Sequence, residues 1–303
     1  MQFLIQTGWE RDVNQYLPTT LDVCLSVMQA SNFMKWKYGE DYDENFEYVG
    51  CDITNLFDAA IYKNAIHQTQ QILQTSNVYG SKLLVPVGTV EFVTQFFKEV
   101  GVTVLPRNVP TSLYNKASRI LGVFTRQELE TKFEGGIGGY LRLHYKDHTR
   151  IKGFRGIWNT MANTPPDGCA LKLEMSIEVD FTTEWRIFVY KGNIEDIRNY
   201  AGDPFHIPSR SWVMDCIDAF KKEAPIAYTL DVGYCKPEWS SITTDNRLLC
   251  SARYKEGWEV VEVHDFFSCG LYGFNPNETY LHMLHAWFYE KLNQEIIARK
   301  QRS

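Results

Sequence analysis

Two apolar segments near the C-terminal end each carry a carboxylate within a stretch typical of a β-strand. The first, AYTLDVGY, contains Asp231, and the second, WEVVEVHD, contains Glu262 and His264. Alternate side chains of a strand lie on one face of a sheet, so Glu262 and His264 are predicted to point the same way. An unpaired carboxylate among apolar side chains is costly, so each acid needs a partner. The chain must therefore form a sheet in which these acids meet a cation or a donor.

A divalent metal ion is one partner that suits these two strands. Mg²⁺ is commonly bound through one or two carboxylates together with phosphate oxygens. Asp231 and Glu262 would supply two carboxylates from adjacent strands. The alternative is a structural role, with Glu262 paired on an edge strand and Asp231 in a turn or a helix cap. These residues alone leave both interpretations open.

A second segment, EVDFTTEWRIFVYKGNI, places charged residues inside another apolar strand. Glu184 and Arg186 are two residues apart and are predicted to share one face. Residues 178–181, just before them, would connect two strands. The backbone groups of such a connector can read an adenine edge, while an acidic residue holds ribose hydroxyls. The alternative is that Glu184 and Arg186 form an internal ion pair with each other or with neighbours.

A third segment, YLRLHYKDHTRIKGFRG, combines cations with glycines. Arg142 is predicted on a strand, and Lys152 lies in a glycine-flanked loop. Glycines let a backbone approach a ligand closely, and a basic loop of this kind can close over a polyphosphate. The spacing does not match the Walker A pattern GxxxxGK[ST]. A solvated basic loop is the alternative.

The N-terminal third is predicted to form a small α/β domain. The 303 residues are enough for two fused lobes. Residues 82–87, 89–100 and 102–106 have the patterns of a strand, a helix and a strand, which indicates a small parallel sheet. We therefore assign residues 1–111 to an N-terminal α/β domain.

The rest of the chain has the pattern of an α+β domain. A helix is predicted over residues 112–121, and strands recur from residue 139 onward. An amphipathic helix, predicted over residues 278–300, ends in basic residues that suit the negative end of the helix dipole. Residues 112–303, including this helix, are therefore assigned to the second domain, with antiparallel strands and flanking helices.

The composition excludes several classes of protein. A formal net charge of −6 argues against a nucleic-acid surface over the whole chain, although it leaves a local basic groove open. The seven cysteines include no CxxC pair, which is typical of reduced thiols in a cytosolic protein. No apolar stretch approaches the roughly 18 residues of a membrane span, and the N-terminal apolar run is too short for a signal peptide. We expect a cytoplasmic protein without a membrane partner; its oligomeric state is not indicated.

These segments stand in a series of motifs with a particular order: VPVGTVEF at 85–92, EWRIFV at 184–189, YAGD at 200–203, APIAYTLDVG at 224–233 and VVEVHDFFSCGLYG at 260–273. A cationic strand and loop, a connector ending in an acid, and strands bearing further acids follow one another. Over residues 80–275 this order resembles the ATP-grasp superfamily, and more narrowly a branch common in bacteria and their phages. The resemblance implies an ATP-grasp-like fold, with two α+β subdomains that grip a nucleotide, preceded by the small α/β domain.

The resemblance also implies a role for each matching residue. Arg142 and Lys152 would contact the ATP phosphates, and Arg186 would face the phosphoryl group or the acceptor. Lys152 and Arg186 are therefore the predicted catalytic residues. Glu184 would hold the ribose. The adenine hinge would consist of Glu178, Val179, Asp180 and Phe181.

The metal ligands implied by the resemblance are Asp231, Glu262 and His264. The family usually has asparagine at the position of His264. Histidine is a softer donor than an amide oxygen and a less natural partner for Mg²⁺. Three consequences are open: Asp265 substitutes as a ligand, Mn²⁺ is tolerated better than Mg²⁺, or the metal binds more weakly. The segment from residue 235 to residue 255 is also longer than the family pattern.

The activity implied is an ATP-dependent carboxylate–amine ligase. It would use ATP with Mg²⁺ or Mn²⁺, form an acyl phosphate on a carboxylate-bearing acceptor, and count peptides and proteins among its candidate acceptors. The first alternative is a weak or inactive ATP-binding module that acts as a sensor or binds a partner. The second is a nucleic-acid ligase, but neither KDHT at Lys146 nor KGFR at Lys152 matches its KxDG motif. A purely structural role is the third.

Overall fold

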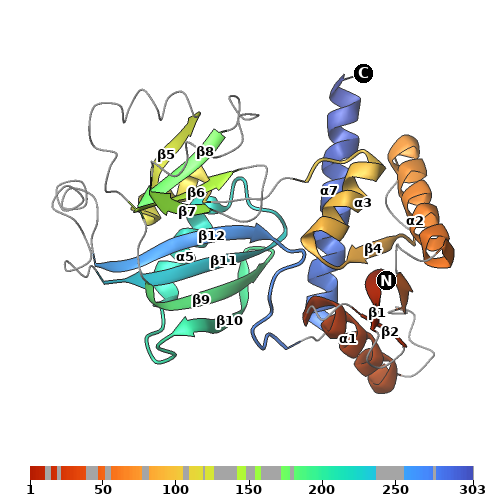
Figure 1. Ribbon diagram of the computed structural model, residues 1–303, viewed down its shortest axis with the longest axis horizontal. Coiled ribbons are helices and arrows are strands. Elements are labelled where there is room, and N and C mark those ends of the chain that lie inside the picture. Colours follow the sequence, from red (N-terminus) through yellow and green to blue (C-terminus); the bar gives the residue numbers. More distant parts are fainter. Residues whose placement is uncertain are drawn as a thin grey trace. The chain divides into compact units, whose positions relative to one another are not determined.

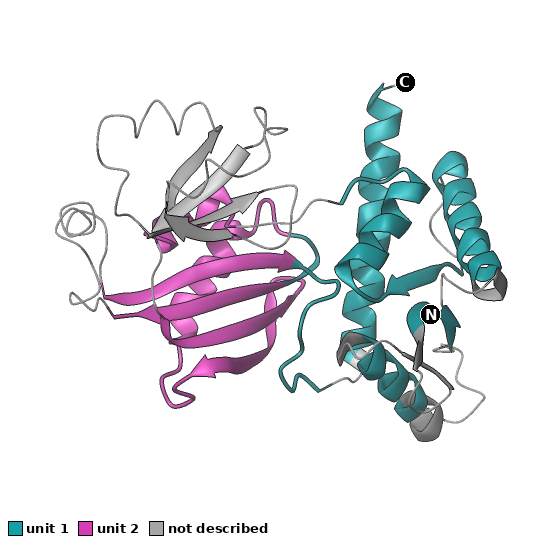
Figure 2. Ribbon diagram, viewed as in Figure 1, with its two compact units in different colours: residues 1–104, 225–228, 265–303 teal, residues 105–224, 229–264 magenta. Residues whose placement is uncertain are grey.

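The structure is a computed structural model. It describes residues 1–10, 15–18, 22–38, 47–51, 56–76, 82–104, 109–118, 120–125, 142–147, 154–157, 172–177, 181–236, 256–275 and 278–302. The chain divides into two compact units, coloured separately in Figure 2. The first contains residues 1–104, 225–228 and 265–303, and the second contains residues 105–224 and 229–264.

The first unit contains a small, mainly parallel sheet (Figure 1). Strand β1 (Gln2–Glu10) pairs in parallel with β3 (Glu47–Cys51) and with β4 (Leu84–Val87). The end of β1 also pairs with β2 (Gln15–Pro18), in the antiparallel sense. The apolar side chains of residues 3–5 are fully buried, which explains why β1 is the shared strand. The expected small parallel sheet is confirmed.

The helices of the first unit are α1 (Asp22–Tyr38), α2 (Leu56–Thr75), α3 (Val90–Val100) and α7 (Glu278–Arg302). The sequence explains α3 well. Its N-cap is Thr89, whose hydroxyl accepts a hydrogen bond from the Phe92 backbone N–H at 3.1 Å. It ends at Gly101, whose φ of 84° suits a glycine. Its apolar face is buried, with Phe97 in ring contact with Trp287 of α7 at 5.5 Å between centroids.

Two expected elements of the domain junction are wrong. Residues 102–104 form no strand, so the parallel sheet takes β1 and β3 as partners of β4; residues 105–106 lie outside the described residues. The helix expected over 112–121 is instead a 3₁₀ turn, η1 (Thr111–Lys116), followed by a strand, β5 (Ile120–Thr125). The β-branched and aromatic residues of ILGVFT favour the strand.

The second unit contains two four-stranded sheets and helix α5 (Arg210–Phe220). One sheet has the order β5-β8-β6-β7, with antiparallel pairing throughout. Its remaining strands are β6 (Arg142–Asp147), β7 (Phe154–Ile157) and β8 (Lys172–Ile177). An antiparallel sheet was expected in this region, and the fold class is therefore α+β, as predicted.

The other sheet of this unit carries the predicted acidic residues. Its order is β10-β9-β11-β12, formed by β9 (Phe181–Tyr190), β10 (Asn193–Gly202), β11 (Ala227–Cys235) and β12 (Gly257–Asp265). β11 lies in the middle and is buried at all but one position. Helix α5 packs on this sheet, with the rings of Trp212 and Trp258 at 6.4 Å between centroids. The strands expected at residues 184–190, 227–234 and 258–264 are confirmed.

The compact units divide the chain differently from the expected domains 1–111 and 112–303. Helix α7 confirms the expected C-terminal helix, yet it belongs to the first unit because its aromatic side chains pack against α3. The boundary at residue 111 stays a prediction. None of the described helices is long and apolar enough to cross a bilayer.

Candidate active site

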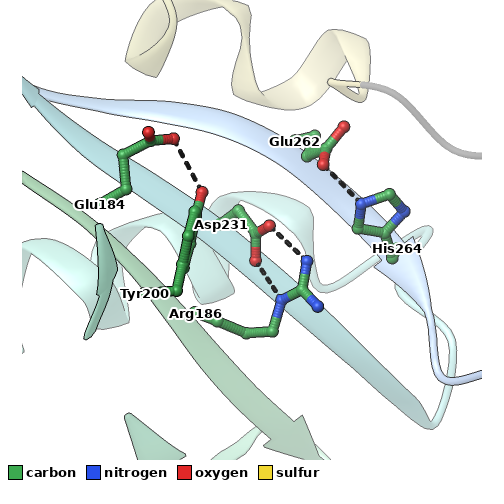
Figure 3. A network of polar contacts seen from close by, with 6 residues as sticks. All are labelled: Glu184, Arg186, Tyr200, Asp231, Glu262 and His264. Carbon is green, nitrogen blue, oxygen red and sulfur yellow. Dashed lines mark hydrogen bonds and ion pairs between the residues drawn. The ribbon is translucent and has the colours of Figure 1, made fainter. Parts of the chain in front are cut away.

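Six polar side chains gather on the sheet formed by β9 to β12 (Figure 3). They come from all four strands: Glu184 and Arg186 from β9, Tyr200 from β10, Asp231 from β11, and Glu262 and His264 from β12. Strand alternation places Glu184 with Arg186, and Glu262 with His264, as the sequence predicts. The sheet thus collects residues that are up to 80 positions apart in the chain.

The centre of the cluster is a buried ion pair between Arg186 and Asp231. The Arg186 Nε donates to Asp231 Oδ1 at 2.8 Å, and Nη2 donates to Oδ2 at 2.6 Å. The two residues are only 5% and 1% exposed. This two-pronged contact satisfies the planar guanidinium and the carboxylate together. The alternative of an internal ion pair for Arg186 is therefore correct in this structure, although the partner is Asp231 and not Glu184.

Glu184 makes a different contact. Its Oε2 accepts a hydrogen bond of 2.9 Å from the hydroxyl of Tyr200. The pKa of Tyr200 is raised above its usual value of 10, first by burial and then by the negative charges of Asp231, Glu184 and Glu262. The hydroxyl therefore keeps its proton and acts as the donor to Glu184. Tyr200 was quoted in the YAGD motif without a role, and the sequence gives no sign that it faces Glu184.

A pair of partly exposed ligand groups completes the cluster. The Nε2 of His264 lies 2.6 Å from Oε1 of Glu262, and each side chain is about a quarter exposed. Asp231, Glu262 and His264 each offer one ligand atom, and these three atoms lie within 4.8 Å of one another. The structure thus brings the three predicted metal ligands together.

The donor set fits a divalent cation. Three carboxylates face one guanidinium among the six side chains, so negative charges outnumber positive ones when the imidazole is neutral. Thr229 lies two residues from Asp231 on the same strand face, and its buried hydroxyl has no hydrogen-bond partner among the described residues. Buried polar groups are normally satisfied by protein, water or ligand, so this hydroxyl is consistent with a bound species beside it.

Asp265, considered above as a substitute ligand, lies elsewhere. It points to the opposite side of β12 from His264 by strand alternation, and its carboxylate forms a buried ion pair of 2.7 Å with Lys291 of α7. The structure therefore does not support Asp265 as a replacement for an oxygen ligand at position 264.

The remaining predicted residues are placed only in part. Phe181 begins β9, and its ring packs where a Cβ at Gly233 would lie, so β11 needs glycine at that position. Arg142 lies on β6, with its side chain outside the described part of the chain. Lys152, Glu178, Val179 and Asp180 lie outside the described residues. Their assigned contacts with phosphate and adenine stay predictions.

Residues 167–282 match a family described as "ATP-grasp domain", the second family of one clade within the ATP-grasp superfamily. This stretch contains all six side chains of the cluster. The chain carries an ATP-grasp domain. The membership predicted from the order of the motifs is thereby confirmed, and the cluster lies within the ATP-grasp domain. No curated protein matches the sequence.

Solved structures similar to this chain include several ATP-grasp ligases. D-alanine–D-alanine ligase from Bacillus anthracis complexed with ATP is 11% identical, with 100% of this chain and 99% of that chain covered and a TM-score of 0.39. N5-carboxyaminoimidazole synthetase from Staphylococcus aureus is 10% identical, with 87% and 69% covered and a TM-score of 0.43. ATP-grasp ligase PsnB, complexed with precursor peptide PsnA2 and AMPPNP, is 12% identical, with 96% and 97% covered and a TM-score of 0.38. Because these TM-scores lie below 0.5, the assignment rests on the family match.

Proposed function

We propose that this chain is an ATP-dependent carboxylate–amine ligase that works through an acyl phosphate. In this reaction a carboxylate oxygen of the acceptor attacks the γ-phosphorus of ATP and ADP leaves. An amine then attacks the acyl carbon, and inorganic phosphate leaves. The observation that carries the proposal is the cluster of Asp231, Glu262, His264 and Arg186 within the ATP-grasp domain.

The residues of the cluster suit the charges of this reaction. Asp231, Glu262 and His264 would hold a divalent ion, Mg²⁺ or Mn²⁺, which when bound would offset the charge of the phosphate oxygens. Arg186, with Lys152, would stabilise the phosphoryl group as it transfers, because fixed cations in a site shielded from water lower the cost of developing charge. Glu184 would accept hydrogen bonds from the ribose hydroxyls. The carboxylate acceptor is a small molecule, a peptide or a protein.

Glu262→Gln is the direct test of this function. The substitution keeps the size of the side chain and removes the charge that a metal ligand needs. ADP release with ATP, Mg²⁺ or Mn²⁺ and a panel of carboxylates and amines should fall at least about 100-fold. The matched control is Glu256→Gln, because Glu256 accepts a hydrogen bond from Tyr234 at an exposed position outside the cluster. Undiminished ADP release by Glu262→Gln would contradict the assignment.

A second candidate is an ATP-binding module without catalysis, which senses the nucleotide or binds a partner. It is favoured by the full engagement of Asp231 with Arg186, because a carboxylate held by a guanidinium at both oxygens is a weaker metal ligand. It predicts ATP binding, measured by calorimetry, with no ADP release for any acceptor. The same assay panel therefore separates the two functions.

A further inference from the structure

Tyr200 reaches the cluster because β10 contains an irregularity at that residue. The register between β10 and β9 pairs Asn199 with Trp185 and Ala201 with Glu184, so Tyr200 is an extra residue between two paired positions. Such a β-bulge redirects a side chain and is common beside active sites. A regular strand would give Tyr200 a partner on β9 and a different direction. The bulge is thus the local cause of its position in Figure 3.

Neighbouring groups hold the bulge in place. The side-chain amide of Asn199 donates to Thr183 Oγ1 at 3.0 Å and to the backbone oxygens of Glu184 at 3.0 Å and Ala201 at 2.9 Å. Gly202 follows with a φ of 73°, at a position where a Cβ would collide with the backbone oxygen of Thr182. Glycine tolerates both the left-handed conformation and the close approach. The bulge is therefore a specified feature of the strand.

From this position Tyr200 contacts both charged residues of β9. Its hydroxyl donates to Glu184 Oε2 at 2.9 Å, and its ring lies 5.9 Å from Cζ of Arg186, within the range of a cation–π contact. Because the raised pKa keeps the hydroxyl protonated, the donor role towards Glu184 does not change with pH in the ordinary range. Arg186 in turn holds Asp231. One tyrosine thus links Glu184 to the buried ion pair.

We propose that Tyr200 is a positioning residue, which orients the Glu184 carboxylate towards the nucleotide ribose and holds the Arg186 guanidinium against Asp231. The inference rests on the proposed function, because it assigns Glu184 to the ribose. Tyr200 itself need not touch the nucleotide. Its hydroxyl governs nucleotide affinity through Glu184, and its ring governs turnover through Arg186.

The test of the hydroxyl is Tyr200→Phe, measured with two nucleotides. ATP carries both ribose hydroxyls, and 2′,3′-dideoxy-ATP carries neither, so only ATP benefits from an oriented Glu184. We expect the Kd for ATP to rise about tenfold, as for one lost hydrogen bond to a charged group, and the Kd for dideoxy-ATP to stay unchanged. Tyr234→Phe is the matched control, because it removes a similar hydroxyl-to-carboxylate hydrogen bond, to Glu256, and should change neither Kd.

The test of the ring is Tyr200→Leu. This variant loses the hydroxyl and the aromatic face together, so turnover should fall about tenfold below that of Tyr200→Phe at saturating ATP. Melting temperatures and circular dichroism identify a variant that does not fold. In that case Glu184→Gln supplies a second route: it should weaken ATP binding and leave dideoxy-ATP binding unchanged, because Tyr200 acts only through Glu184.

The outcomes separate this inference from the proposed function. Equal weakening of ATP and dideoxy-ATP by Tyr200→Phe would mean a general structural role and would overturn the inference. An unchanged Kd for ATP in a folded Tyr200→Phe, or equal effects of Glu184→Gln on both nucleotides, would overturn it too. In each of these cases ATP binding by the unsubstituted chain still stands. Failure of that chain to bind ATP would instead overturn the proposed function and this inference with it.

Discussion

His264 places an imidazole nitrogen 2.6 Å from the Glu262 carboxylate, on the same strand face and within reach of Asp231. The identity of one donor atom influences which metal a site prefers. Imidazole nitrogen suits transition metals, whereas Mg²⁺ prefers oxygen ligands. With Asp265 engaged by Lys291, the imidazole has no oxygen substitute there, and the proposed site should favour Mn²⁺ over Mg²⁺.

His264→Asn replaces the nitrogen donor with an amide oxygen. The ratio of Mg²⁺ affinity to Mn²⁺ affinity should rise about tenfold, because only the Mn²⁺ complex loses a preferred ligand. Titration calorimetry with each ion, on protein held with a non-hydrolysable ATP analogue, measures both affinities. His67→Asn, at an exposed position on α2, is the control. An unchanged ratio would show that His264 is not a ligand.

At the scale of elements, β9 and β11 are joined by a contact that only glycine permits. A Cβ at Gly233 would overlap the ring of Phe181, and Thr182 donates to the backbone oxygen of Tyr234 at 3.3 Å beside it. The two strands therefore approach closely at the start of β9, where the predicted adenine hinge enters the sheet. The same two strands carry Arg186 and Asp231 farther along.

Gly233→Ala should lower the free energy of unfolding by about 1–3 kcal/mol, because overpacking forces the ring or the strands to move. Urea unfolding measures the change. Phe181→Leu in the same chain makes room for the new methyl group, so the double variant should be more stable than the sum of the single effects predicts. Additive effects would mean that the Phe181 ring is not what the methyl group meets.

At the scale of the whole molecule, helix α7 contributes a buried histidine to the first unit. The pKa of His285 is lowered from 6.5 to about 4, first by burial, then by the positive charges of the amino terminus and of His282. Between these two pKa values the unfolded chain binds the proton more readily than the folded chain. Stability is therefore full above about pH 6.5 and falls as the pH drops towards 4.

The slope from this residue is at most about 1.4 kcal/mol per pH unit and is reduced by solvent screening. His285→Gln should flatten the dependence of the unfolding free energy on pH between 6.5 and 4. Urea unfolding at a series of pH values measures it. His67→Gln serves as the control, since the exposed His67 side chain should leave the slope as it is. An identical slope in His285→Gln would assign the acid sensitivity to other groups.

Local pattern carries much of this fold because its signals are periodic. The alternation of β9 and β12 predicts that Glu184 shares a face with Arg186, and Glu262 with His264, and the helical spacing of α3 predicts its buried face. The same reasoning is wrong at residues 112–121, where the predicted helix gives way to η1 and β5. Apolar residues at mixed spacing fit both elements, so only the pairing of β5 with β8 decides between them.

The chain's own sequence determined the donor types, their spacing along each strand and the family to which the motifs belong. The tertiary structure alone decided the partners: Arg186 with Asp231, Glu184 with Tyr200, and Asp265 with Lys291. These contacts join residues from different strands or from a strand and a helix, so they depend on strand order, register and one bulge at Tyr200. A single-residue shift of register changes which face a side chain occupies, and no local pattern encodes that shift.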